Sequence, residues 1–546
     1  MSTKDKFDDD IALNDPLSNT EELVARDVPP GVDRRTFIMR SAVIGAATVM
    51  TGRAISARER TLKAFAESLE PPQGPGAPPL DKNLNVVKKG QGPVLTVIDE
   101  FYKVGPGPSS SHTIGPMRIT YDFYQRAAKL PADQLATATA LKVNLFGSLS
   151  ATGKGHGTER AALAGLVGKE PATVDPKFLD GLRDKPDQVF PVKLGDKSID
   201  VSLKDIIYDA TKGDFHHPNT MTCKLLAGDK VLLEQEYYSV GGGFIEWKGY
   251  TPPKKNPPKY PFRTMKELRA HADNNKLTIA QVMLANEMSI AGRTQEEVYA
   301  FVDKIINAMT ATVKSGLAMS EDDVLPGPIK LHSKAATVYK RAMDDAVVAD
   351  RGVGMLSACA LAASEENARG HLVITAPTGG SAGVMPSLVY ALLEARKLPL
   401  QKVRDGMLAA AAIGYLCKHH ATLSAAEGGC QAEIGVASSM AAALVATAND
   451  AESRVVENAA ESALEHHLGM TCDPVAGYVQ VPCVERCAFG AVKAWTAYAI
   501  ASNEIASRHR VDLDATILAL AETARDMNSK YKETSEAGLA LSVVLC

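Results

Sequence analysis

The feature that most constrains the fold is an abrupt change of sequence pattern at a proline-rich stretch, TPPKKNPPKYPF, residues 251–262. Before it, short runs rich in β-branched and aromatic residues, such as ALKVNLFGSL, alternate with segments of helical spacing. After it, segments such as DGMLAAAAIGYLCKHHA are alanine-rich and carry apolar residues three and four apart, with hardly any strand signal. The sequence therefore predicts an α+β domain over residues 94–250, a hinge at 251–262 and a mostly α-helical domain over residues 263–546.

The length and the charge narrow the class of protein. A chain of 546 residues should hold at least two domains. The 60 Lys and Arg residues against 64 Asp and Glu residues leave a formal net charge of −4, which provides neither a basic nucleic-acid footprint nor a basic membrane patch. We therefore expect a protein that acts on a small molecule and has no nucleic-acid partner.

The segment before residue 94 differs from the rest of the chain. Residues 1–30 are polar and acidic and are expected to be a disordered leader. Residues 31–57 carry Arg34 and Arg35 followed by an apolar run too short to span a bilayer, and this pattern resembles a twin-arginine export signal. An ordinary amphipathic segment is the alternative. A linker that includes a Pro/Gly-rich stretch is predicted over residues 58–93.

A polar loop in the first domain, VGPGPSSSHTIGPMRI, is the clearest candidate site there. Its polar side chains are those of Ser109, Ser110, Ser111, His112 and Thr113. A helix is expected to begin near the threonine, where the serines can cap it and its free N–H groups can bind a carboxylate. The positive end of the helix would lower the pKa of His112 and keep the imidazole neutral, able to accept a proton. A plain capping loop is the alternative.

Three further loops are polar but weak as signals when taken alone. FGSLSATGKGHGTERA carries His156 in a glycine-rich turn that matches neither the phosphate loop nor the dinucleotide fingerprint. FHHPNTM places Asn219 just before a predicted strand. APTGGSAGVMPS could bind a phosphate group and raises pyridoxal phosphate as a rival cofactor, although no lysine stands out as its Schiff-base partner.

The cysteines gather in the second half of the chain, with seven of the eight after residue 350. They are too sparse for a disulfide scaffold. Cys430 lies beside glycines and Glu433, and Cys472 and Cys483 lie around a turn in TCDPVAGYVQVPC. Glycine or proline beside each thiol leaves room for the inorganic sulfide of a cluster, whereas a buried inert thiol is the alternative. Spacing alone names no metal.

Together these stretches resemble the bacterial iron–sulfur L-serine dehydratases (L-serine ammonia-lyases) in their single-chain form. The resemblance covers residues 94–546 and rests on GPSSSHTIGPMR, FGSLSATGKGHGT, FHHPNTM, GCQAEIGVASSMAA, TCDPVAGYVQVPCVER and RDMNSKYKETSEAGLALSVVLC. It implies a lyase that eliminates water from L-serine to give pyruvate and ammonia, and a homodimer. The alternatives left open are a related β-eliminating lyase, such as a cysteine desulfidase, and a non-catalytic amino-acid-binding protein.

The resemblance also implies a cofactor, an oxygen-sensitive [4Fe–4S] cluster held by Cys430, Cys472 and Cys483. One iron would stay open as a Lewis acid for the hydroxyl of serine, and Cys546 would occupy that iron in the resting enzyme. Cys487 stands where family members usually carry asparagine, so either Cys546 or Cys487 could be the fourth ligand. The leader is foreign to these normally cytoplasmic enzymes, and the localisation stays open.

The same resemblance implies roles for the polar loops of the first domain. His112 would take the α-proton of the substrate, with His156 as the second choice. The residues expected to bind the substrate are Ser109, Ser110, Ser111, Thr113 and Asn219.

Overall fold

The computed structural model describes residues 92–543, with the exception of residues 212, 214, 253 and 346. The predicted leader, the predicted export signal and the terminal Cys546 lie outside the described residues.

The first part of the described chain is built on a five-stranded sheet with the order β5-β2-β6-β7-β8. The strands are β2 (Ala140–Leu145), β5 (Ile206–Tyr208), β6 (Thr220–Ala227), β7 (Lys230–Ser239) and β8 (Ile245–Trp247). Side chains of β2 alternate between buried and half-buried, which is the period-two pattern of a strand with one face on a core. A hairpin of β3 (Phe190–Leu194) and β4 (Lys197–Val201) stands beside this sheet.

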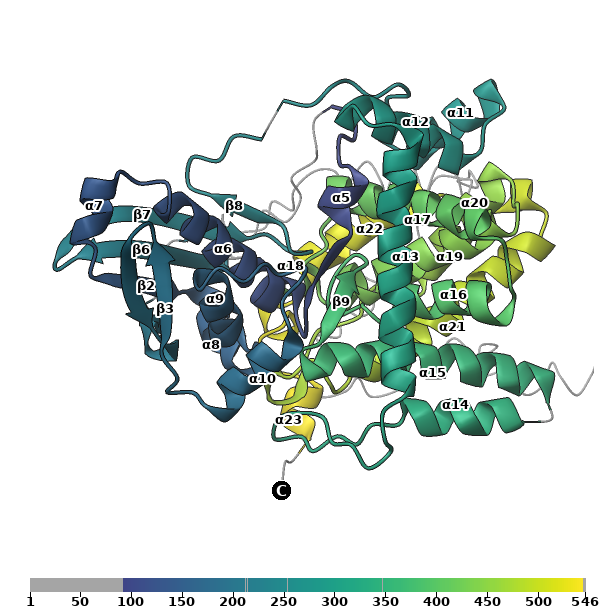
Figure 1. Cartoon of the computed structure of the whole chain (residues 1–546). Helices are drawn as coiled ribbons and strands as arrows, with labels where there is room; N and C mark the ends of the chain where they lie inside the picture. The colour runs from purple at the N-terminus through teal and green to yellow at the C-terminus, as the bar shows by residue number, and fades with distance from the viewer. Residues whose placement is uncertain (1–91, 212, 214, 253, 346, 544–546) are drawn as a thin grey trace, which may run out of the picture. The chain divides into compact units, whose positions relative to one another are not determined.

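Helices complete the predicted α+β part. They are α5 (Ile98–Phe101), α6 (Gly115–Ala127), α7 (Ala132–Thr137), α8 (Gly147–His156), α9 (Thr158–Leu166) and α10 (Pro176–Asp184). All of them except α5, whose Ile98 and Phe101 lie in the core of the second part, contribute buried residues to the core beside the sheet. The longest of them, α6, packs closely on α9 and also touches β6 and β7 (Figure 1). The mixed class expected for this region is confirmed.

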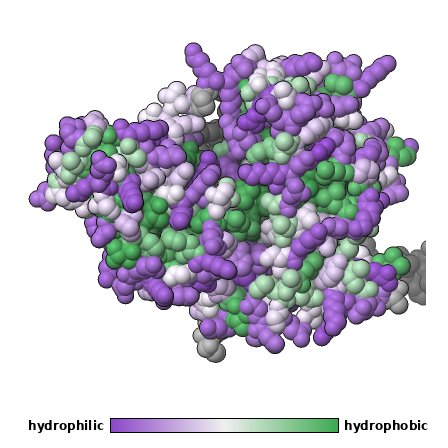
Figure 2. All heavy atoms as spheres, viewed as in Figure 1, coloured by the Kyte–Doolittle hydropathy of each residue, from purple (hydrophilic) through white to green (hydrophobic). Residues whose placement is uncertain are grey.

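The second part is almost entirely helical, as predicted (Figure 1). Its helices are α11 (Met265–Asn275), α12 (Ile279–Ala291), α13 (Gln295–Leu317), α14 (Ala335–Asp344), α15 (Val348–Arg369), α16 (Val384–Tyr390), α17 (Leu400–His420), α18 (Ala425–Gly428), α19 (Ile434–Ala448), α20 (Ser453–Glu465), α21 (Cys483–Asn503), α22 (Leu513–Asp526) and α23 (Leu539–Ser542). On the face drawn in Figure 2 the surface is mostly hydrophilic, as expected for helices whose apolar sides point inward.

The centre of this part is α19, which packs on α16, α17, α20 and α21. It is buried along nearly its whole length, because alanine and glycine let its neighbours approach closely. Among the described residues, Cys430–Ala448 is the one segment long and apolar enough to cross a membrane, and 89% of its apolar window is buried inside the protein.

A short antiparallel strand pair joins the two parts. β1 (Lys103–Pro106) pairs with β9 (Leu372–Thr375). β1 leads into the serine loop of the first part, and β9 leads into the loop APTGGSAG of the second. A Cβ on Gly379 would approach the backbone nitrogen of Ser110 to 2.8 Å, so the two loops lie directly against each other. Loops far apart in the sequence are therefore brought to one place.

A buried carboxyl group is expected to make the stability of the helical core depend on pH. Glu287 on α12 accepts hydrogen bonds from the Ile98 N–H (3.0 Å) and the Tyr415 hydroxyl (2.9 Å). Burial raises the pKa of Glu287 from 4.5 to about 7. Between these values the folded protein holds a proton that the unfolded chain releases, so this group lowers the free energy of unfolding as the pH rises through that window.

We expect Glu287→Gln to remove this pH dependence, since the amide keeps an acceptor for the Ile98 N–H and stays neutral. Relative to the parent, the variant should gain about 3 kcal/mol between pH 4.5 and pH 8. Urea denaturation of both proteins at several pH values measures the difference. The exposed Glu296→Gln is the control. A parallel pH profile for Glu287→Gln and the parent would contradict the prediction.

Candidate active site and metal centre

Three cysteines from separate loops converge beside α19. Cys430 begins a 3-10 turn just before this helix, Cys472 lies in the loop after α20, and Cys483 is the first residue of α21. All three are buried. Ligand atoms of Cys430, Cys472 and Glu433 lie within 4.8 Å of one another, and the thiol of Cys483 also interacts with that of Cys430.

The three thiols favour one negative charge on Cys430. Hydrogen bonding from Cys472 and then Cys483 lowers the pKa of Cys430 well below its usual range, and the same contacts raise the pKa values of Cys472 and Cys483. The Arg486 guanidinium adds a positive charge beside this thiolate. It is held in place by the Thr471 carbonyl, to which it donates at 2.6 Å. Thiolate is the form in which cysteine binds a metal.

The surroundings of the thiols fit a bound inorganic group. Gly429 has a left-handed φ of 72°, and a Cβ there would meet the Met470 carbonyl oxygen at 2.7 Å, so only glycine lets the two loops meet. Among the described residues, Gln431 Nε2, His467 Nε2 and Glu533 Oε2 are buried without a hydrogen-bond partner. Buried polar atoms are rarely left unpaired. Three soft thiol donors together with such atoms fit an iron–sulfur cluster.

The segment after α22 lies on the Cys472 loop. Cys472 forms a parallel bridge with Lys532, donating its N–H to the Tyr531 carbonyl at 2.7 Å. The Glu533 N–H donates in turn to the Cys472 carbonyl at 2.8 Å. Further along, Asp473 accepts a hydrogen bond from the Leu539 N–H at 2.6 Å. These contacts bring Glu533 to the site from the far end of the sequence.

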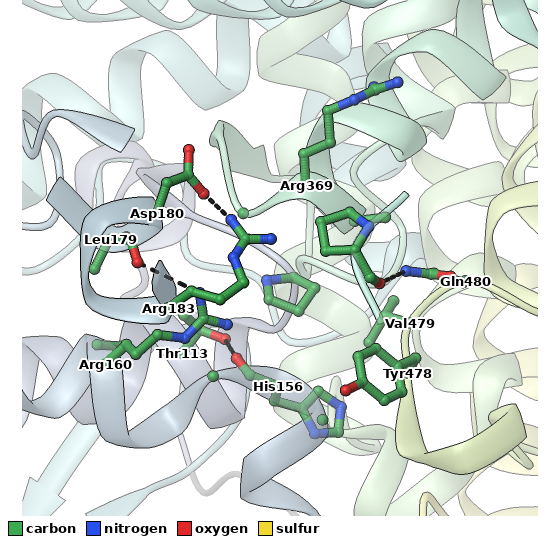
Figure 3. A pocket seen from close by; sticks show the side chains of 18 residues that line it. Thr113, His156, Arg160, Leu179, Asp180, Arg183, Arg369, Tyr478, Val479 and Gln480 are labelled. Carbon is green, nitrogen blue, oxygen red and sulfur yellow. Dashed lines mark hydrogen bonds and ion pairs between the residues drawn. The ribbon is translucent and has the colours of Figure 1, made fainter. Parts of the chain in front are cut away.

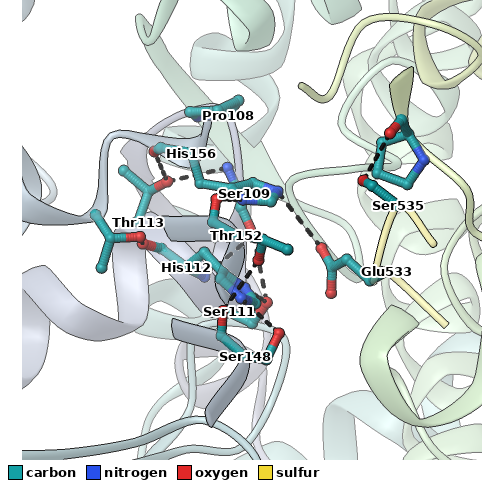
Figure 4. A network of polar contacts seen from close by, with 12 residues as sticks. Pro108, Ser109, Ser111, His112, Thr113, Ser148, Thr152, His156, Glu533 and Ser535 are labelled. Carbon is teal, nitrogen blue, oxygen red and sulfur yellow. Dashed lines mark hydrogen bonds and ion pairs between the residues drawn. The ribbon is translucent and has the colours of Figure 1, made fainter. Parts of the chain in front are cut away.

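His112 lies in a π-helical turn, η2 (Ser110–Ile114), that continues into α6. The helix therefore begins at Ser110, three residues earlier than predicted, and Ser109 is its cap, accepting the His112 N–H at 3.1 Å. Both ring nitrogens have hydroxyl partners, Ser111 Oγ at 2.9 Å from Nδ1 and Ser148 Oγ at 3.0 Å from Nε2 (Figure 4). The ring is held in one orientation by groups that can each donate or accept a proton.

His156, the last residue of α8, stands beside His112 with the ring centroids 4.6 Å apart. Its Nδ1 donates to the Thr152 carbonyl at 2.9 Å, which leaves the lone pair of a neutral ring on Nε2. This nitrogen faces Glu533 Oε1 at 3.7 Å (Figure 4). The imidazole and the carboxyl group are both buried.

Burial keeps both histidines neutral. It lowers the pKa of His156 to about 4. It also lowers the pKa of His112 well below its usual range, with the neighbouring His156 as the second cause. For His112 the neutral state is the one expected from the sequence, but its main cause is desolvation rather than the helix end. Burial, followed by the charge on Cys430, raises the pKa of Glu533 to about 8.

Two of the residues expected to bind substrate, Thr113 and Asn219, have different surroundings. Thr113 is engaged in structure, since its hydroxyl donates to the His156 carbonyl at 2.9 Å. Asn219 is fully buried and donates to the Ser239 carbonyl at 3.2 Å, while its Oδ1 has no partner among the described residues. Ser239 in turn donates to the Ser111 carbonyl at 2.7 Å, which ties the FHHPNTM loop to the serine loop.

Cys487 follows Cys483 by one turn of α21 but has a different environment. Its thiol donates to the Gly380 carbonyl at 3.3 Å. Burial raises its pKa to about 11, so it stays a protonated thiol. Its contact is with the APTGGSAG loop.

Three residues that the structure brings to the site were not among the predicted site residues: Ser148, Arg486 and Glu533. Each lies inside one of the family-like stretches, in FGSLS, PCVER and KETSEAG. They could have been proposed as site residues because each is a charged or hydroxyl side chain within a stretch that resembles the family. Glu433 was noticed only as a neighbour of Cys430, and its pKa is raised well above the usual range by burial and by Glu533.

Both parts of the chain match known proteins. The family model described as serine dehydratase beta chain matches residues 97–250, and that described as serine dehydratase alpha chain matches residues 274–540. The chain is 39% identical over 463 residues to an L-serine dehydratase of Haemophilus influenzae, covering 83% of this chain and 100% of that protein. It is 40% identical over 458 residues to L-serine dehydratase TdcG of Escherichia coli, covering 82% and 98%. The chain belongs to the L-serine dehydratase family, with the beta-chain and alpha-chain regions joined in one polypeptide.

Proposed function

We propose that this chain is an L-serine ammonia-lyase, which eliminates water from L-serine and yields pyruvate and ammonia. The observation that carries the proposal is that Glu533 links a buried three-thiol centre to two neutral histidines, since it lies 3.7 Å from His156 and is influenced by the charge on Cys430. The named relatives are L-serine dehydratases, which supports the same substrate here.

The proposed cofactor is a [4Fe–4S] cluster held by Cys430, Cys472 and Cys483. When bound, it would supply a Lewis acid for the departing hydroxyl group. Cys430 already favours the thiolate, and Arg486 offsets the negative charge that such a centre gathers. Glu433 is kept protonated by its raised pKa, so its oxygens compete little with the thiolates as ligands.

His112 is proposed to accept the α-proton, because its ring is neutral, buried and oriented by Ser111 and Ser148. The Cα–H bond then breaks toward His112, and the Cβ–O bond breaks as the hydroxyl takes a proton from the His156–Glu533 pair and leaves as water. The aminoacrylate formed tautomerises to an imine, which water hydrolyses to pyruvate and ammonia. Release of the proton from His112 and reprotonation of the pair restore the site.

Binding of the substrate is assigned to the serine loop and to the FHHPNTM loop. The serines at the start of the η2–α6 helix are proposed to hold the carboxylate, where free N–H groups favour an anion. The unpaired Asn219 Oδ1 is an acceptor suited to the ammonium group.

Three expectations remain predictions. Cys546, the proposed ligand of the fourth iron, lies outside the described residues. The attachment of the preceding segment to the Cys472 loop supports this role, and the hydrogen bond from Cys487 to Gly380 argues against Cys487 in its place. The homodimer and the twin-arginine export route stay predictions as well.

The test of this function is pyruvate release by protein reconstituted anaerobically with iron and sulfide, without pyridoxal phosphate. We expect pyruvate from L-serine only when the cluster is present, and loss of activity in air. L-Cysteine and L-threonine are supplied in parallel. Cluster-loaded protein that makes no pyruvate from L-serine would refute the proposal, and preferential release of hydrogen sulfide from L-cysteine would reassign the leaving group.

A further inference from the structure

A small cavity lies beside His156, between the two parts of the chain (Figure 3). Its lining includes His156 and three arginines from three helices, Arg160 on α9, Arg183 on α10 and Arg369 on α15. The one carboxylate in the lining is that of Asp180. The cavity therefore has a positive wall next to a proposed catalytic histidine.

Two of the three guanidinium groups are already neutralised. Arg369 is paired with Asp323 at 2.6 Å and with Glu366 at 3.1 Å. Arg183 forms an ion pair with Asp180 (Figure 3). These two arginines have little charge left to offer a ligand.

Arg160 is different, because its contacts are long. Its guanidinium reaches the Leu179 carbonyl at 3.5 Å and Glu159 Oε1 at 3.9 Å, and the other oxygen of Glu159 already accepts the Tyr208 hydroxyl. The side chain folds back over Gly157, where a Cβ would collide with the guanidinium. Because residue 157 is glycine, the guanidinium of Arg160, which has only distant negative partners, can lie at the cavity beside His156.

The size of the cavity limits what it can take. About 30 Å³ of it is open to the centres of water-sized spheres, which exceeds the roughly 10–15 Å³ that one enclosed water molecule needs by this measure. Such a space admits a small group such as a carboxylate. A guanidinium group binds a carboxylate through two parallel hydrogen bonds. An anion in this cavity would supply the close negative partner that Arg160 lacks.

We propose that Arg160 anchors a carboxylate subsite in this cavity, beside His156 and against Thr113 of the serine loop, and that the subsite holds small carboxylates on their way to or from the active site. That these carboxylates are L-serine entering and pyruvate leaving rests on the proposed function. The subsite makes capture of substrate depend on charge, so its contribution should weaken as salt is raised.

The first test is direct binding of pyruvate to the cluster-free protein by isothermal titration calorimetry, which needs no turnover. Arg160→Met should weaken binding about tenfold or more, Arg160→Lys should weaken it less, and added salt should weaken the parent. The control is Arg404→Met, whose side chain is 25% exposed against 22% for Arg160 and lies in an ion pair with Asp303. Equal affinity in parent, Arg160→Met and Arg160→Lys overturns the proposal.

Steady-state kinetics with L-serine separates the subsite from the proposed function. Arg160→Met should raise KM and leave kcat nearly unchanged, whereas a merely structural role would lower kcat and cluster content together. Arg160-dependent pyruvate binding without turnover of L-serine supports the subsite and refutes the function. If L-serine is turned over but neither KM nor the affinity for pyruvate changes in Arg160→Met, the function is supported and the subsite is refuted. Inorganic phosphate is the second probe, and tighter Arg160-dependent binding of phosphate than of pyruvate overturns the carboxylate assignment.

Discussion

Replacing Cys430 by alanine is expected to leave a folded protein that holds no cluster and makes no pyruvate. Cys430 is the thiol on which the other two converge, and its pKa is the one that the site lowers. Without it, only two buried thiols remain, Cys472 and Cys483, for which burial still favours the protonated form. Mutation of a residue that only supports a metal ligand typically lowers activity roughly tenfold to a hundredfold. Loss of Cys430, a proposed ligand, should lower it by more than that.

The measurement is iron and acid-labile sulfide per chain after anaerobic reconstitution, together with pyruvate release. Cys417→Ala is the matched control, since Cys417 is equally buried but lies in α17 away from the other thiols. It should keep its iron, its sulfide and its activity. Circular dichroism checks that both variants fold. Full iron content and activity in Cys430→Ala would remove this residue from the ligand set.

Replacing His112 by alanine is expected to stop exchange of the α-proton of L-serine with solvent while the cluster still assembles. The ring lies among hydroxyl groups of Ser111 and Ser148, and no contact with the three cysteines holds it. A positioned general base contributes roughly a hundredfold to ten-thousandfold to a rate. We expect a loss of that size in exchange, measured by mass spectrometry of L-serine recovered from deuterated buffer.

Two further variants sharpen this result. Glu533→Gln should retain α-proton exchange but slow pyruvate release, because it removes the proton of the His156–Glu533 pair and leaves His112 in place. The half-buried His271→Ala, on α11, should behave as the parent. Exchange at the parental rate in His112→Ala would move the base role to His156.

Features that depend on neighbouring residues in sequence were predictable. The change of pattern at the proline-rich stretch separates a mixed region from a helical one. This was predictable because the spacing of apolar residues along the chain differs between strands and helices. Ser109 was expected as a cap for the same reason, because an N-cap acts on the N–H groups two or three residues later. The predicted start of the helix after the serine loop was three residues too late, because the helix begins with the π-helical turn η2 and the sequence carries no pattern that predicts such a turn.

Features that depend on burial or on distant pairs were not predictable from spacing. The neutral state of His112 was attributed to a helix end, whereas desolvation is its main cause, and desolvation is a property of the packed protein. Glu533 was overlooked because it reaches His156 only through the bridge between Cys472 and Lys532.

The sequence by itself determined the two kinds of structure, the capped loop around His112 and the glycine- and proline-rich turns that carry the candidate thiols. Only the tertiary structure decided that Cys430, Cys472 and Cys483 meet, that the rings of His112 and His156 lie side by side, and that Arg160 stays weakly paired at the cavity. The physical reason is that periodicity and capping are energies of adjacent residues, whereas charge, desolvation and metal-ligand geometry are set by atoms that meet only when the chain has folded.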